Sequence, residues 1–106
     1  MHQVSPASAE PICSEFADDP DFRELLEEFG KALPERREGL LAAHRSGERD
    51  LLRTRAHQLK GAGGGFGFPR LSELAADLER ASIEREPVRI AETLESLIGY
   101  MSRITI

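Results

Sequence analysis

The chain has 106 residues, of which 40% are hydrophobic and 31% charged, and this suits one domain with a modest core. Its net charge of −5 argues against nucleic acid as a partner, and no apolar run has the length of a membrane span or the pattern of a signal peptide. The single cysteine, Cys13, excludes an internal disulfide and favours a reducing compartment, so the expected location is cytoplasmic.

Residues 1–18 are polar and contain prolines, so we expect a flexible N-terminal segment there. Within it, Ile12 and Phe16 are expected to dock on the domain through a short helical turn. Cys13 and His2 belong to no ligand or redox pattern, and we interpret both as inert.

A first long helix is predicted to begin at Asp19 and Pro20, because an aspartate N-cap followed by proline is a common helix start. It should end near Arg45, with Gly47 as its C-terminal stop. Pro34 has no accompanying turn residues, so we expect one helix kinked there or two nearly continuous helices. The apolar positions recur every three or four residues, at Phe22, Leu25, Leu26, Phe29, Leu33, Leu40 and Leu41.

Three further helices are predicted in the rest of the chain. The second extends from about Glu48 to Gly65 or Phe66, the third begins at Pro69, and the fourth begins at Pro87 after a polar turn. The apolar positions of the last two helices are Leu71, Leu74, Ala75, Leu78 and Ala81 or Ser82, then Ile90, Ala91, Leu94, Leu97, Ile98, Met101 and Ile104.

Short connections make consecutive helices antiparallel neighbours. The predicted fold class is therefore all-α: residues 19–106 form an up-down antiparallel four-helix bundle, with the first long helix kinked near Pro34. Bundles of this kind also hold metals, but the paired Glu-x-x-His pattern of a di-iron site is missing, and haem ligation by His57 would lack an attachment motif.

The second predicted helix carries a histidine on its polar face and a cluster of glycines. At roughly 100° per residue, His57 lies about 120° to 140° from the apolar stripe and should point to solvent. Arg53, Gly61 and Gly64 share its face, and Lys60 lies between that face and the core edge. The apolar stripe itself consists of Leu52, Ala56, Leu59 and Gly63.

These residue types suit the acceptance of a phosphoryl group on a ring nitrogen. A neutral imidazole is a good nucleophile near pH 7 and needs no general base, because its attacking nitrogen carries a lone pair. A lysine one helical turn further on can offset charge on the transferring group. Glycines on an exposed face let a partner approach closely, although a glycine inside a helix costs roughly 1 kcal/mol relative to alanine. The cluster is not a phosphate-binding loop, because no Gly-Lys-Ser/Thr follows and no strand precedes it.

The hexapeptide Ala-His-Gln-Leu-Lys-Gly at 56–61 resembles the motif of histidine-containing phosphotransfer (HPt) domains, which relay phosphoryl groups in two-component signalling. The resemblance extends from about Phe22 to Ile104. It implies that His57 is the phosphoacceptor, usually at Nε2, that Lys60 supports the phosphoryl group, and that Gly61 leaves room for the partner. This chain departs from the family pattern in the density of its glycines after the motif.

The resemblance also implies a phosphorelay intermediate without kinase activity of its own. His57 would receive a phosphoryl group from a receiver-domain aspartate or from a kinase and pass it to another receiver. Arg53, Gln58, Gly61 and Gly64 would contact the partner. We expect no cofactor, since any Mg²⁺ would belong to the receiver, and a monomer.

Alternative functions remain open at this stage. Sensor-kinase dimerisation domains also phosphorylate a helical histidine, but typically follow it with an acidic residue where this chain has Gln58. A phosphoacceptor fragment of a chemotaxis-type histidine kinase would share the bundle and the motif. A non-catalytic bundle that binds a receiver is the third possibility. His44 lies near the edge of an apolar stripe, so we expect it to be packed or half-buried rather than a second site.

Overall fold

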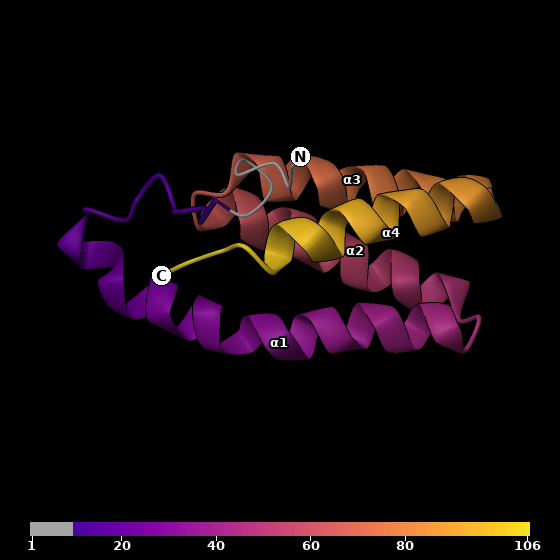
Figure 1. The fold of residues 1–106 in the computed structure, drawn as a ribbon, viewed down its shortest axis with the longest axis horizontal. Coiled ribbons are helices and arrows are strands. Elements are labelled where there is room, and N and C mark those ends of the chain that lie inside the picture. Colours follow the sequence, from indigo (N-terminus) through magenta and orange to yellow (C-terminus); the bar gives the residue numbers. More distant parts are fainter. Residues whose placement is uncertain (1–9) are drawn as a thin grey trace, which may run out of the picture.

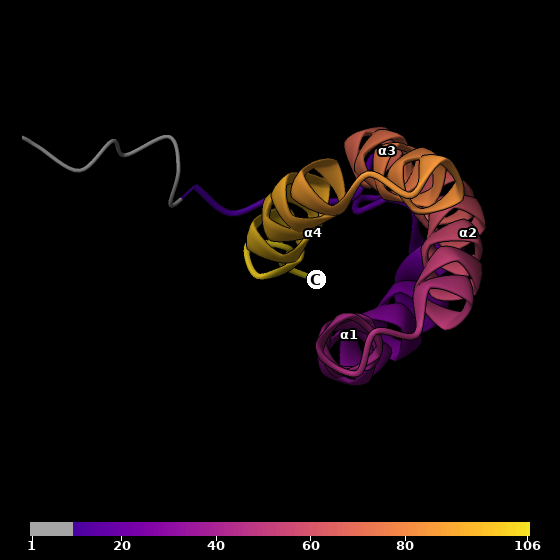
Figure 2. The same cartoon turned by 90° about the vertical axis from the view of Figure 1, so that its right-hand side faces the viewer.

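The computed structural model describes residues 10–106 and places four α-helices in them (Figure 1). Their bounds are Arg23–Arg45 for α1, Arg49–Gly65 for α2, Pro69–Glu84 for α3 and Pro87–Met101 for α4. The helices alternate in direction and enclose one apolar core (Figure 2). The predicted all-α bundle is confirmed.

The first helix begins as its sequence suggests. Asp19 accepts a hydrogen bond from the backbone N–H of Asp21 at 3.0 Å and caps a short 3-10 turn, η2, at Pro20–Phe22, which leads into α1. The helix continues through Pro34, and Figure 1 shows its N-terminal part inclined to the rest. Of the two predicted alternatives, one helix through Pro34 or two nearly continuous helices, the structure has the single helix.

Helices α2 and α3 form the most extensive contact of the bundle. Gly63 makes this possible, because a Cβ there would lie 3.0 Å from the backbone nitrogen of Ser72 and 3.3 Å from the Leu71 side chain. Ser72 also donates a hydrogen bond to the carbonyl of Lys60 at 2.8 Å. The turn between the helices needs Gly67, whose φ is +84°. This hairpin decides which side chains of α3 face those of α2.

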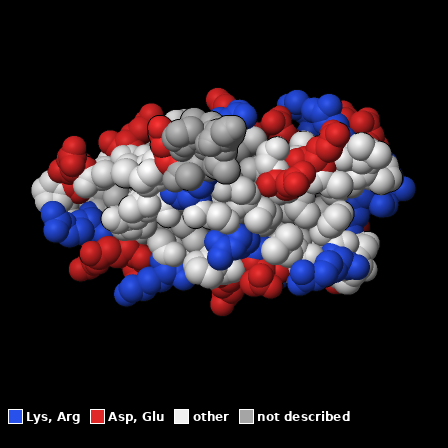
Figure 3. Space-filling model, in the orientation of Figure 1, with Lys and Arg blue, Asp and Glu red and all other residues white. Residues whose placement is uncertain are grey.

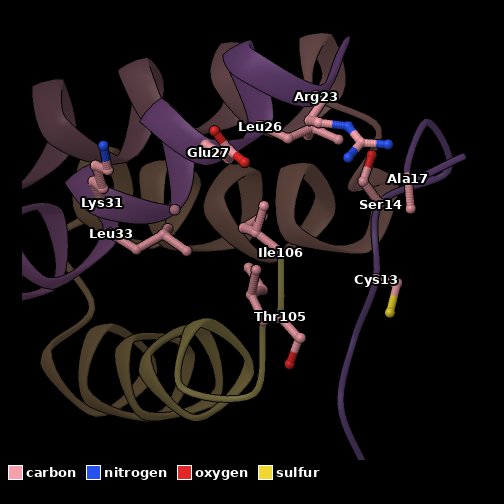
Figure 4. A pocket seen from close by; sticks show the side chains of 12 residues that line it. Cys13, Ser14, Ala17, Arg23, Leu26, Glu27, Lys31, Leu33, Thr105 and Ile106 are labelled. Carbon is pink, nitrogen blue, oxygen red and sulfur yellow. The ribbon is translucent and has the colours of Figure 1, made fainter. Parts of the chain in front are cut away.

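Among the helix pairs that touch, the first and last helices have the smallest contact, and the C-terminal residues lie between them (Figure 2). A Cβ on Gly30 of α1 would lie 2.6 Å from Cγ1 of Ile106, so a larger residue there would displace this half-exposed side chain. A cavity of about 710 Å³ remains there, and Figure 4 shows Leu26 and Leu33 of α1 on one side of it and Ile106 reaching in from the other.

The N-terminal segment 10–18 lies against the C-terminal residues and the end of α2. Ile12 pairs with Ile104 in an isolated β-bridge, and Phe16 stacks on Phe22 with ring centroids 4.4 Å apart. Both residues dock as expected, but Ile12 does so through the bridge and not through a helical turn. Ser14 is buried and donates to the carbonyl of Phe66 at 2.6 Å, which ties the segment to the end of α2. The first part of the predicted tail, residues 1–9, lies outside the described residues.

Acidic and basic side chains are interspersed around uncharged surface on the face shown in Figure 3. None of the helices within residues 10–106 is long and apolar enough to cross a bilayer.

Candidate functional site

The centre of α2 presents His57 to solvent. The helix buries Leu52, Ala56, Leu59 and Gly63, as the predicted stripe requires, and this turns the imidazole outward with 63% of its side chain exposed. The ring is not isolated, because its Nδ1 lies 2.9 Å from Oε2 of Glu79 on α3. An exposed histidine is thereby held in one orientation by a neighbouring helix.

The same carboxylate also binds Lys60. The lysine Nζ lies 2.9 Å from Oε1 of Glu79, so each oxygen of the carboxylate holds one of the two side chains from α2. The side chain of Glu79 is only 14% exposed and that of Lys60 is 38% exposed. Because His57 and Lys60 lie one turn apart, a single carboxylate beside α2 can reach both of them.

Burial alone would raise the pKa of Glu79, but hydrogen bonds from Lys60 and His57, with their charges, outweigh it and leave the pKa below the usual 4.5. The carboxylate is therefore ionised near neutral pH. An ionised carboxylate only accepts hydrogen bonds, so Nδ1 of His57 must donate. In the neutral ring, the proton is on Nδ1 and the lone pair is on Nε2, the nitrogen that Glu79 does not contact.

A strip without side chains follows His57 along α2. Within the described part of the chain, a Cβ on Gly61 or Gly65 would meet no other group within 4 Å, and one on Gly64 would meet only Oγ of Ser72, at 3.9 Å. All three glycines are exposed. Packing inside the chain therefore explains Gly63 but none of these three, although each lowers helix stability by roughly 1 kcal/mol.

The other predicted contact residues are less closely associated with this cluster. Gln58 is exposed and lines a narrow gap beside α1 together with Arg55, away from Glu79. Arg53 is half-buried one turn before His57. The expectation for His44 is wrong, because this residue is exposed: Ala43 takes the buried position in the last turn of α1, and His44 lies on its solvent side.

Sequence reasoning missed Glu79 and Ser72. In an antiparallel hairpin, residues equally far from the turn face each other, and Glu79 lies about as far beyond Gly67 as His57 lies before it. That symmetry would have pointed to Asp77 and Glu79 as the acidic candidates. Among residues 10–106, no three histidine, cysteine or acidic side chains gather as a metal site would require.

Comparison with known proteins matches the chain to one protein family. The family model described as Hpt domain matches residues 24–103, which include all four helices apart from the first residue of α1. No curated protein and no solved structure gives a significant match.

Proposed function

The chain belongs to the Hpt domain family, and we propose that it is a phosphorelay intermediate whose phosphoacceptor is Nε2 of His57. Hpt domains are phosphocarriers of two-component signalling that interact with receiver domains. On this proposal His57 accepts a phosphoryl group from a receiver aspartate, or from a kinase, and passes it to another receiver.

The observation that carries the proposal is the carboxylate of Glu79 shared by His57 and Lys60. It leaves the lone pair on the exposed nitrogen and orients the ring without a further residue. A histidine with only a surface role would not need a mostly buried carboxylate from another helix behind it.

In the proposed transfer, the Nε2 lone pair forms the N–P bond while the O–P bond to the receiver aspartate breaks, and the aspartate leaves as a carboxylate. The ring keeps its Nδ1 proton and gains positive charge, which Glu79 offsets from 2.9 Å. Lys60 has three donors on a flexible stem, so it can turn one of them to the phosphoryl oxygens as their charge develops. Any Mg²⁺ in this reaction belongs to the receiver.

The partner is proposed to dock over the strip of Gly61 and Gly64, with Arg53 and Gln58 at its margins. Close approach of a receiver accounts for helix glycines that no internal contact requires. We propose that the chain acts as a monomer, which its molar mass in solution will test.

Phosphorylation by phosphoramidate, a small donor, tests the acceptor directly. Intact mass should show one acid-labile phosphoryl group on the wild type and none on His57→Gln. Phosphorus NMR should place it on Nε2. An unmodified wild type would favour the non-catalytic bundle, and a phosphoryl group on Nδ1 would contradict the role given to Glu79.

A further inference from the structure

A second site lies at the end of the bundle where the α1–α2 turn and the α3–α4 turn meet, the end that faces the viewer in Figure 2. A cavity of about 230 Å³ opens there between the two turns and the first turns of α2 and α4. Its lining residues are Ala43, His44, Gly47, Arg49, Leu52, Arg85, Pro87 and Ile90.

The lining is basic although the chain is acidic. It includes two arginines and a histidine but no aspartate or glutamate, whereas the whole chain has 19 acidic residues and 14 lysines and arginines. Within residues 10–106, neither Arg49 nor Arg85 has an ion-pair partner within 4.0 Å. Four carboxylates line the two adjacent depressions, Glu48 and Asp50 in one and Glu86 and Glu92 in the other, and that of Glu48 accepts a hydrogen bond from Ser46 at 2.6 Å.

Arg85 adopts a backbone conformation that favours glycine. Its φ is +57° and its ψ +45°, and among residues 10–106 it is the only residue other than glycine with positive φ. The turn after α1 has Gly47 in the corresponding conformation, at φ +70°. An arginine in this position strains the backbone, and no ion pair inside the described chain compensates for it.

The floor of the cavity is apolar, formed by Ala43, Leu52 and Ile90 of the core. Guanidinium groups bind carboxylate and phosphate oxygens in pairs, and an apolar floor favours a hydrocarbon body. We propose that this end pocket binds a small organic oxyanion, either a carboxylate or a phosphate monoester, with Arg49 and Arg85 on the anion. The volume of the pocket is below that of ordinary ligand sites, so the hydrocarbon part of the ligand is no larger than about one ring.

Benzoate and phenyl phosphate are suitable probes, with benzyl alcohol as the neutral control and inorganic phosphate as the headgroup alone. Titration followed by ¹H–¹⁵N NMR should give saturable shifts at residues 44–52 and 85–90 with at least one aromatic anion. Inorganic phosphate should bind more weakly, and benzyl alcohol should not bind. The two aromatic anions decide between a carboxylate and a phosphate headgroup.

Arg85→Gly separates a binding role from a structural one. Glycine relieves the backbone strain, so the variant should melt at a higher temperature than the wild type and yet bind the probe at least tenfold more weakly. Arg49→Gln should weaken binding similarly. Arg80→Gln removes the same charge from an exposed position of α3 and should bind as the wild type does.

Several results would overturn the site. They are the absence of saturable shifts with both aromatic anions, equal binding by benzyl alcohol, and unchanged affinity in Arg85→Gly and Arg49→Gln. A lower melting temperature for Arg85→Gly would also count against the site, because it would show that the arginine stabilises the fold. Phosphorylation of His57 does not enter this test, because His57→Gln keeps every lining residue and should bind the probes normally.

Discussion

Replacing Glu79 by glutamine tests the central element of the site. The Glu79→Gln side chain would keep its shape and could still accept from Nδ1 of His57, but it would lose the charge that stabilises the ring during transfer. Hydrogen bonds to charged groups contribute about 1.5–3 kcal/mol, and the exposure of His57, at 63%, places the loss at the low end of that range. About 1.4 kcal/mol corresponds to a tenfold slower reaction.

The assay follows phosphorylation of the purified protein by phosphoramidate with intact mass spectrometry at pH 7. We expect the rate constant of Glu79→Gln to fall about tenfold, while its free energy of unfolding falls by about 1 kcal/mol or less, because the Lys60 pair is partly exposed. Glu73→Gln is the matched control on α3, because Glu73 is exposed and its only ion-pair partner among residues 10–106 is Arg70, at 3.0 Å.

Nitrogen NMR of the imidazole gives an independent measurement. The neutral ring of the wild type should carry its proton mainly on Nδ1, and Glu79→Gln should shift this population towards the Nε2 tautomer. If both the tautomer ratio and the rate constant of the variant stay within twofold of the wild type, the role assigned to Glu79 is wrong.

Three further predictions concern stability and the docking strip. Gly64→Ala should raise the free energy of unfolding by about 1 kcal/mol and slow transfer to a receiver, whereas Gly63→Ala should lower the free energy of unfolding by about 1–3 kcal/mol, because its Cβ meets Ser72 at 3.0 Å. Urea unfolding and transfer assays check both variants, and faster transfer by Gly64→Ala would argue against docking there. Ser72→Ala should cost about 1 kcal/mol in urea unfolding through the lost bond to Lys60, and an unchanged midpoint would contradict this. Since the pKa of Glu79 is lower in the folded protein than its usual 4.5, the stabilisation that Glu79 provides should be complete above about pH 5 and lost as the pH falls through the folded pKa. If the wild type still had a larger free energy of unfolding than Glu79→Gln below that pKa, this prediction would be refuted.

The helices and the orientation of His57 were predictable because both depend on local periodicity. Apolar residues at three- and four-residue spacing predict which face of each helix is buried, and the structure buries Leu52, Ala56 and Leu59 as expected. The outward position of His57 then follows from its angle to that stripe. The exposure of His44 was not predictable in the same way, because a residue at the edge of an apolar stripe is covered or exposed according to how the neighbouring helices pack.

The partners of these side chains were decided by tertiary structure. His57 and Glu79 are 22 residues apart, and they meet because the close packing at Gly63 and the turn at Gly67 set the register of α3 against α2. The bond from Ser14 to Phe66 likewise spans 52 residues. Helical periodicity thus determined the fold class and the exposed histidine from the sequence alone. Helix register, which local sequence does not encode, decided the pairing of His57 with Glu79, the proton on Nδ1 and the basic end pocket.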